Sequence, residues 1–121
     1  MSRILICDDD SDLVQLFTER FTGEGYELIA CKNGNDTLKL VEEQKPDLVI
    51  QDALVPGKHG FEVCKEIKSR STTKHIPVIM MTAVYTKSRY RQEVISKYGA
   101  QDYLMKPIDI SDLVARVKKF I

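Results

Sequence analysis

The sequence predicts a single α/β domain built on a doubly wound parallel sheet, and three observations support this. The chain has 121 residues, which is the size of one domain. Five short apolar runs are typical of strands, and a segment with apolar residues at helical spacing follows each of them. Strands that alternate with helices form a parallel sheet with helices on both faces. We therefore expect residues 1–121 to form one domain.

The five expected strands are short and mostly apolar. They are Arg3–Cys7, Tyr26–Cys31, Asp47–Gln51, Pro77–Thr82 and Asp102–Met105. Right-handed crossovers between them favour a flavodoxin-like (βα)5 fold, with five parallel strands and five helices. In such sheets a ligand binds at the carboxyl ends of the strands, where the strand order reverses.

The five expected helices follow from apolar stripes after each strand. The stripes are Leu13, Leu16, Phe17 and Phe21; Leu38 and Val41; Phe61, Cys64 and Ile67; Tyr90, Val94 and Tyr98; and Ile110, Leu113, Val114, Val117 and Phe120. Capping residues support these helices: Asp10 or Ser11 precedes the first, and Asp109 or Ser111 opens the last. Gly23 and Gly99 follow the ends of the first and fourth.

Composition excludes several classes of function. Lys+Arg and Asp+Glu both count 18, so a net charge of zero gives no reason to expect direct nucleic-acid binding. Apolar runs such as "IPVIMM" are too short to cross a bilayer, and the N-terminus lacks the features of a signal peptide. Cys7, Cys31 and Cys64 share no metal-ligand spacing, which indicates buried free thiols. We expect a cytoplasmic protein without membrane insertion.

Polar residues stand at four of the five strand ends. Asp8 and Asp9 follow the first strand, Asp52 ends the third, Thr82 the fourth and Lys106 the fifth. Clustered carboxylates suit a hard cation, Mg²⁺ above all and Mn²⁺ as an alternative. Asp52 could then act as a carboxylate nucleophile that forms an aspartyl phosphate. Lys106 could pair with one phosphoryl oxygen and Thr82 donate a hydrogen bond to another.

Four segments together resemble the receiver domain of bacterial two-component response regulators: "ILICDDD", "PDLVIQDALVPGKHG", "PVIMMTA" and "GAQDYLMKP". The resemblance covers nearly the whole chain. It implies that Asp8, Asp9 and Asp52 bind the metal and that Asp52, with Pro56 and Gly60 after it, is the phosphoacceptor. It also implies that Thr82 and Tyr103 are the switch residues and that Lys106 is the active-site lysine, before a cis bond to Pro107.

The resemblance implies a phosphorylation switch rather than an enzyme with a separate substrate. A histidine kinase or a histidine phosphotransfer protein would supply the phosphoryl group to Asp52 with Mg²⁺ bound. Thr82 and Tyr103 would then move and remodel the face of the fourth helix, fifth strand and fifth helix. A downstream protein or a covalently linked output domain would respond, and the sequence leaves both open.

Two features depart from the pattern of relatives, and two further residues bear on the lifetime of the phosphorylated form. Gln51 stands where relatives mostly carry an apolar residue, so it needs hydrogen-bond partners if it is buried. The "VYTKSRY" segment makes the loop before the fourth helix about two residues longer than usual. The resemblance also implies that Leu54 and Val84, two positions beyond Asp52 and Thr82, set the rate of dephosphorylation; neither can position an attacking water, which predicts a long-lived phosphoaspartate.

Other functions explain these residues less well. An EF-hand calcium loop needs glycine at its sixth place, where Leu13 stands. A phosphohydrolase with Asp8 as nucleophile would need a substrate-binding cap for which the chain is too short, and a flavin or dinucleotide site would need a glycine-rich loop. His59 and His75 are expected to be solvated loop residues. A degenerate receiver that docks partners without phosphorylation stays as the alternative.

Overall fold

The computed structural model describes residues 2–83 and 97–121. In this part of the chain five strands form one parallel sheet in the order β2-β1-β3-β4-β5. They are β1 (Arg3–Cys7), β2 (Glu27–Cys31), β3 (Leu48–Asp52), β4 (Val78–Thr82) and β5 (Asp102–Met105). β1 and β5 match the predicted bounds, β2 and β4 begin one residue later than predicted, and β3 is shifted by one residue at both ends. The flavodoxin-like strand order is confirmed.

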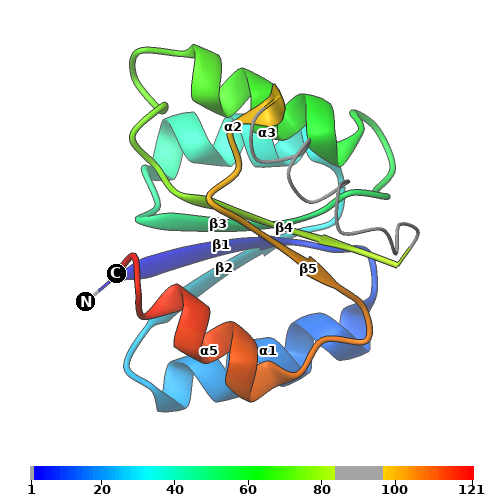
Figure 1. Cartoon of the computed structure of the whole chain (residues 1–121), viewed down its shortest axis with the longest axis vertical. Helices are drawn as coiled ribbons and strands as arrows, with labels where there is room; N and C mark the ends of the chain where they lie inside the picture. The colour runs from blue at the N-terminus through cyan, green and yellow to red at the C-terminus, as the bar shows by residue number, and fades with distance from the viewer. Residues whose placement is uncertain (1, 84–96) are drawn as a thin grey trace.

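Helices cover both faces of the sheet (Figure 1). α1 (Ser11–Gly23) and α5 (Ile110–Val117) lie on one face, while α2 (Gly34–Gln44) and α3 (Gly60–Ser69) lie on the other. The stripe predicted for the fourth helix falls mostly on residues 84–96, and so does the "VYTKSRY" loop; both lie outside the described residues. None of the described helices has the length and apolar character that a bilayer-spanning segment needs.

Capping side chains begin the helices. The Asp10 carboxylate accepts hydrogen bonds from the backbone N–H groups of Asp12 and Leu13, so Asp10 rather than Ser11 caps α1. Asp109 caps α5 in the same way, and Asn33 caps α2 by accepting from the N–H of Asp36. These caps begin helices immediately beyond the strand ends.

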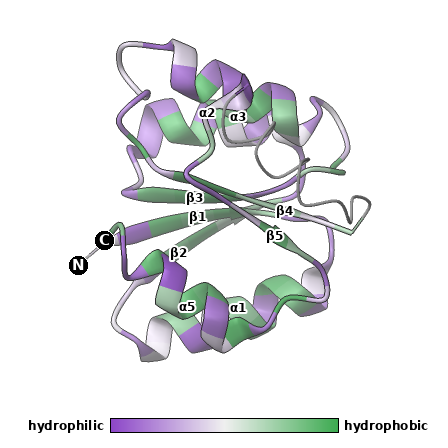
Figure 2. Ribbon diagram, viewed as in Figure 1, coloured by the Kyte–Doolittle hydropathy of each residue, from purple (hydrophilic) through white to green (hydrophobic). Residues whose placement is uncertain are grey.

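The core consists of two apolar layers, one on each face of the sheet (Figure 2). Successive strand residues point to opposite faces, so Ile4 and Ile6 pack toward α1 and α5, while Leu5 and Cys7 pack toward α2 and α3. β3 and β4 are buried along their whole length, as expected for central strands of a parallel sheet. All three cysteines are buried free thiols, as predicted.

Two members of the predicted helical stripes lie outside the core. The side chain of Leu16 is 55% exposed, because it precedes the buried Phe17 and one residue turns a helix by about 100°. Phe120 is 37% exposed because α5 ends at Val117, so the predicted stripe extends too far. The predicted stripes therefore include two residues that do not pack in the core.

Candidate functional site

The site lies where the strand order reverses. The chain leaves β1 to form β2 on one side, and returns to form β3 on the other side of β1. Asp8 follows β1 and Asp52 ends β3, so the two carboxylates meet although 44 residues separate them. One carboxylate oxygen from each of Asp8, Asp9 and Asp52 can be chosen so that all three lie within 4.8 Å of one another. The predicted convergence of these three residues is confirmed.

The three consecutive acidic residues after β1 have different environments. Asp8 is fully buried, and its Oδ1 accepts a hydrogen bond from the backbone N–H of Asp10 at 2.9 Å. Asp9 is exposed to solvent beside it. Asp10 is occupied as the cap of α1. The acidic run is therefore one buried carboxylate, one solvated carboxylate and one helix cap.

Lys106 reaches this cluster from the end of β5. Its Nζ donates to Asp8 Oδ2 at 2.8 Å and to Asp52 Oδ2 at 3.4 Å, and its backbone N–H donates to the carbonyl of Thr82 at 2.7 Å. The bond from Lys106 to Pro107 is cis, as expected. Burial lowers the pKa of Lys106, but the hydrogen bond to Asp8 and the charge of Asp52 outweigh this, so the pKa is raised overall. The ammonium therefore stays charged at neutral pH.

Asp52 lies in an environment that disfavours its negative charge. Asp52 is 5% exposed, and this burial raises the pKa of its carboxyl group above the ordinary value. The charge of Asp8 raises this pKa further, while Lys106 lowers it. Among the described residues, two buried carboxylates thus share the ammonium of Lys106. A divalent cation beside them would relieve this excess of negative charge, and three carboxylates are the hard oxygen donors that Mg²⁺ prefers.

A tight turn presents Asp52 at the sheet edge. The N–H of Ala53 donates to the carbonyl of Met81, and the N–H of Gly60 donates to the carbonyl of Ala53. A Cβ atom on Gly60 would overlap the carbonyl oxygen of Asp52 and lie 2.7 Å from Cα of Ala53. Gly60 is thus needed for the close approach of α3 to the backbone of Asp52. Leu54, next in the turn, is 49% exposed.

Thr82 and Tyr103 are both buried, Thr82 at the end of β4 and Tyr103 within β5. Thr82 is the last residue of β4 and pairs with Met105, while Tyr103 pairs with Met80 one strand away from β3. The side chain of Tyr103 is 4% exposed and belongs to the apolar layer under α2 and α3. Thr82 ends β4 and Tyr103 lies within β5, as the predicted strands imply, whereas their role as switch residues stays a prediction.

Gln51 is fully buried, and its side-chain amide has partners at both ends. Its Oε1 accepts from the hydroxyl of Thr37 at 2.9 Å, and its Nε2 donates to the backbone carbonyl of Asp52 at 2.9 Å. The burial of a polar side chain next to the acceptor is therefore compensated. Sequence reasoning did not identify Thr37, although it lies four residues before the core residue Val41 on the same helix face.

The two histidines lie on the surface, as expected, and His59 also caps a helix. His59 caps α3, because its Nδ1 accepts from the N–H of Phe61 at 3.3 Å. Its ring also lies against that of Phe61, with centroids 5.3 Å apart. His75 is exposed.

Two open grooves flank the carboxylates. One of about 250 Å³ is lined by Asp8, Ser11 and Cys31 among others. The other, of about 430 Å³, lies between α1 and the turn after β5 and is lined by Leu13, Leu16, Phe17, Pro107 and Ile108 together with Asp10, Asp12 and Lys106. The exposed Leu16 thus belongs to an apolar groove that borders the site.

Comparison with known proteins agrees with this geometry. The family model for the response regulator receiver domain matches residues 4–118. Response regulator PleD of Caulobacter vibrioides is 38% identical over 117 residues, which are 97% of this chain and 25% of PleD. The chain therefore spans about a quarter of the length of the curated relatives it matches.

Solved structures show the same fold. The receiver domain of Francisella response regulator 1452 has a TM-score of 0.91 and 26% identity, over 99% of this chain and 96% of that one. Chemotaxis response regulator CheY4 of Vibrio cholerae has a TM-score of 0.90 and 26% identity, over 100% of this chain and 99% of that one. The match to the family model, which covers almost the whole chain, shows that this protein belongs to the response regulator receiver domains of two-component signalling.

Proposed function

We propose that the protein accepts a phosphoryl group on Asp52 from the phosphohistidine of a histidine kinase or a histidine phosphotransfer protein. The observation that carries this proposal is the cluster of Asp8, Asp9, Asp52 and Lys106 at the switch point of the sheet. Asp52 ends a buried central strand, where it pairs with Met81 of β4 and follows Gln51, which pairs with Cys7 of β1. A carboxylate held in this way is suited to nucleophilic attack.

The residues also fit a bound Mg²⁺ or Mn²⁺ ion. Asp8, Asp9 and Asp52 would hold it, and their oxygens lie within 4.8 Å of one another. When bound, the ion neutralises charge on the oxygens of the transferred phosphoryl group. The partial solvent exposure at Asp9 suits an ion that keeps several of its waters.

The side chains divide the work of the transfer. An Asp52 oxygen attacks the phosphorus, a P–O bond forms, and the P–N bond to the donor imidazole breaks. The imidazole nitrogen keeps the electron pair of that bond and takes a proton from solvent. Lys106, which pairs with both Asp8 and Asp52, can exchange part of this contact for a phosphoryl oxygen. The Thr82 hydroxyl is the proposed donor to another of these oxygens.

The signal is proposed to leave through Thr82 and Tyr103. A contact between Thr82 and the phosphoryl group would favour one arrangement of β5 and its neighbours over another, which is how one local charge biases a two-state element. The face involved includes β5 and α5, which lie beside each other in sequence and structure (Figure 1). The remainder of this face, residues 84–96, lies outside the described residues.

The experiment that tests the proposal is intact-mass spectrometry after incubation with acetyl phosphate and Mg²⁺. We expect a single added phosphoryl group on the wild-type protein, and none when Mg²⁺ is chelated or when Asp52 is replaced in Asp52→Asn. The chain has no tryptophan, so mass is a more direct measurement than fluorescence. Absence of the adduct on folded wild-type protein would refute the proposal and favour the phosphorylation-independent docking module. Gln51, a departure from the pattern of relatives, has hydrogen-bond partners at both ends of its amide, so its burial does not favour that alternative.

A further inference from the structure

A buried polar pair lies directly behind the acceptor. Gln51 and Thr37 are both fully buried in the layer between the sheet and the helices α2 and α3. This layer is otherwise apolar around them, with Leu5, Val49 and Val63 among its members. Two apolar side chains would fill the same space without any need for hydrogen bonds. The presence of the pair therefore calls for an explanation beyond packing.

The hydrogen bonds of the pair run in one direction and end on the acceptor residue. The Thr37 hydroxyl has one proton, and the oxygen at 2.9 Å is Gln51 Oε1, whereas the Asn33 carbonyl is 3.4 Å away. With its proton on Gln51, the Thr37 oxygen accepts from the Cys31 thiol, whose Sγ lies 3.4 Å away. Gln51 Nε2 then donates to the carbonyl of Asp52. The run Cys31–Thr37–Gln51 thus ends on the main chain of Asp52.

The carbonyl oxygen of Asp52 is confined from two directions. The Gln51 amide lies 2.9 Å away, and Gly60 approaches so closely that it has no room for a Cβ atom. The carbonyl belongs to the peptide plane that follows the Cα of Asp52, so its orientation helps to set the direction of the Asp52 side chain. Confinement of this plane limits the positions that the carboxylate can adopt.

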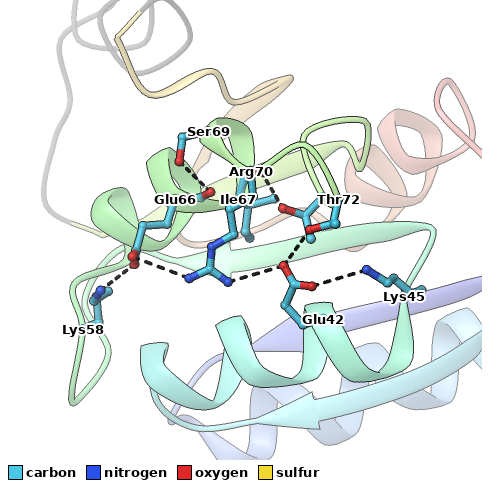
Figure 3. Close-up of polar contacts among 9 residues, drawn as sticks. Glu42, Lys45, Lys58, Glu66, Ile67, Ser69, Arg70 and Thr72 are labelled. Carbon is cyan, nitrogen blue, oxygen red and sulfur yellow. Dashed lines mark hydrogen bonds and ion pairs between the residues drawn. The ribbon is translucent and has the colours of Figure 1, made fainter.

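The N-terminal end of α2 is fixed to the loop that follows Asp52. The N–H of Gly34 donates to the carbonyl of Pro56 at 3.1 Å, and Gly34 packs against the backbone of Lys58. Lys58 forms an ion pair with Glu66 of α3 (Figure 3). Thr37 is therefore carried by a helix that is anchored to the same loop.

A second polar network connects α2 and α3 on the surface of the protein. Arg70 contacts both Glu42 of α2 and Glu66 of α3, and the hydroxyl of Thr72 donates to Glu42 at 2.9 Å (Figure 3). These ion pairs are partly exposed, so each is weak by itself. Together they connect α2 and α3 on the outer surface, while Thr37 and Gln51 connect α2 to β3 inside.

We propose that Gln51 and Thr37 are positioning residues for phosphoryl transfer to Asp52. They hold the main chain of the acceptor so that its carboxylate keeps the orientation needed for attack. This inference rests on the proposed function and adds residues that touch neither phosphoryl group nor metal. Their loss slows the transfer step much more than it weakens the binding of Mg²⁺ and donor, because all three proposed metal ligands stay in place and only the orientation of one of them changes.

The experiment compares Thr37→Val, Thr37→Ser and Gln51→Met with wild type. Valine has the shape of threonine without its hydroxyl, serine keeps the hydroxyl, and methionine replaces the amide with an apolar chain of similar length. The phosphorylation rate is measured by quenched-flow mass spectrometry against acetyl phosphate concentration at saturating Mg²⁺. This separates the limiting rate from the donor concentration that gives half of it, and a titration of each variant gives the Kd for Mg²⁺.

We expect the limiting rate to fall about tenfold in Thr37→Val and in Gln51→Met. The half-saturating donor concentration and the Kd for Mg²⁺ stay within about twofold of wild type. A variant that carries both Thr37→Val and Gln51→Met is no slower than the slower of the two single variants, because the two residues act as one unit. Thr37→Ser returns the rate to within about twofold of wild type.

A purely structural effect is separated by Val41→Ala. Val41 lies one turn after Thr37 on the buried face of α2, is 1% exposed and belongs to the apolar layer. Its truncation lowers the free energy of unfolding and should leave the limiting rate unchanged. All variants are assayed under conditions in which urea titration shows that they are folded.

The inference is overturned by a wild-type limiting rate in Thr37→Val and Gln51→Met, or by a Thr37→Ser variant as slow as Thr37→Val. It is also overturned if Val41→Ala loses rate in proportion to its loss of stability. These results leave the proposed function intact, because wild type still gains a phosphoryl group. Absence of any phosphoryl group on folded wild type refutes both.

Discussion

Replacement of Gly60 by alanine tests how tightly the acceptor's backbone is held. The new Cβ would lie 2.7 Å from Cα of Ala53, whereas ordinary contacts begin at 3.4 Å, so the two must separate by about 0.7 Å. The obstructing atoms are the backbone of Asp52 and Ala53, which cannot rotate away as a flexible side chain would. A shift of this size should cost about 1–3 kcal/mol in the free energy of unfolding. It should also slow phosphorylation by at least about tenfold, because the shift moves the nucleophile.

The assay is a urea titration together with the rate of phosphorylation by acetyl phosphate. Gly23→Ala is the matched control, because a Cβ atom there meets nothing within 4 Å. Gly23 is the last residue of α1, whereas the acidic cluster precedes the first residue of this helix. Alanine at position 23 should therefore leave the rate unchanged and raise helix stability by at most about 1 kcal/mol. A Gly60→Ala variant with the stability and rate of wild type would refute the reasoning that this contact fixes the acceptor.

Four further predictions concern the charges and the lifetime of the phosphorylated form. Arg116 pairs through Nη1 with both oxygens of the buried Asp102 at 2.8 Å, so Arg116→Met should lower the free energy of unfolding by about 2 kcal/mol in a urea titration. Mg²⁺ at one hundred times the Kd of the wild-type protein should raise the wild-type free energy of unfolding by about 2.7 kcal/mol. At the same Mg²⁺ concentration the gain should be smaller in Asp8→Asn, because one ligand charge is lost. Because the pKa of Asp52 is raised in the folded protein, its ionisation removes stability as the pH rises through that pKa. In metal-free buffer the stability of Asp52→Asn relative to wild type should therefore increase as the pH rises, and a constant difference would contradict this. Leu54→Asn should shorten the half-life of the phosphorylated protein, measured by loss of the mass adduct after removal of donor, and an unchanged or longer half-life would exclude a role for the apolar side chain.

The strands were predicted well because each central strand is a short apolar run with a polar residue at its end. In β1, β3 and β4 every residue after Arg3 is buried, so local composition alone marks them. Helix ends were harder to predict. The stripe that continued from Val117 to Phe120 follows the right spacing, but α5 ends at Val117 and leaves Phe120 in a turn.

The candidate site followed from the topology, whereas its supporting contacts did not. Asp8, Asp52 and Lys106 are strand-end residues, so a parallel sheet brings them together whatever the details of packing. Which residue becomes the partner of Gln51 depends on how α2 lies across the sheet. Nothing in the local sequence around Thr37 shows that its hydroxyl lies within hydrogen-bond distance of Gln51. The close approach of Gly60 to Asp52 is similarly a property of packing, although the glycine itself was a signal.

The most direct test of the account is to locate the phosphoryl group on the chain. After phosphorylation with Mg²⁺ and acetyl phosphate, borohydride reduces an aspartyl phosphate to homoserine, and this marks the acceptor permanently. Trypsin does not cut before Pro46, so segment 40–58 carries Asp47 and Asp52 together with Glu42 and Glu43, and fragment masses distinguish them. The account predicts homoserine at position 52, and only in samples that contained Mg²⁺. Homoserine at any other acidic residue, or conversion without Mg²⁺, would contradict it.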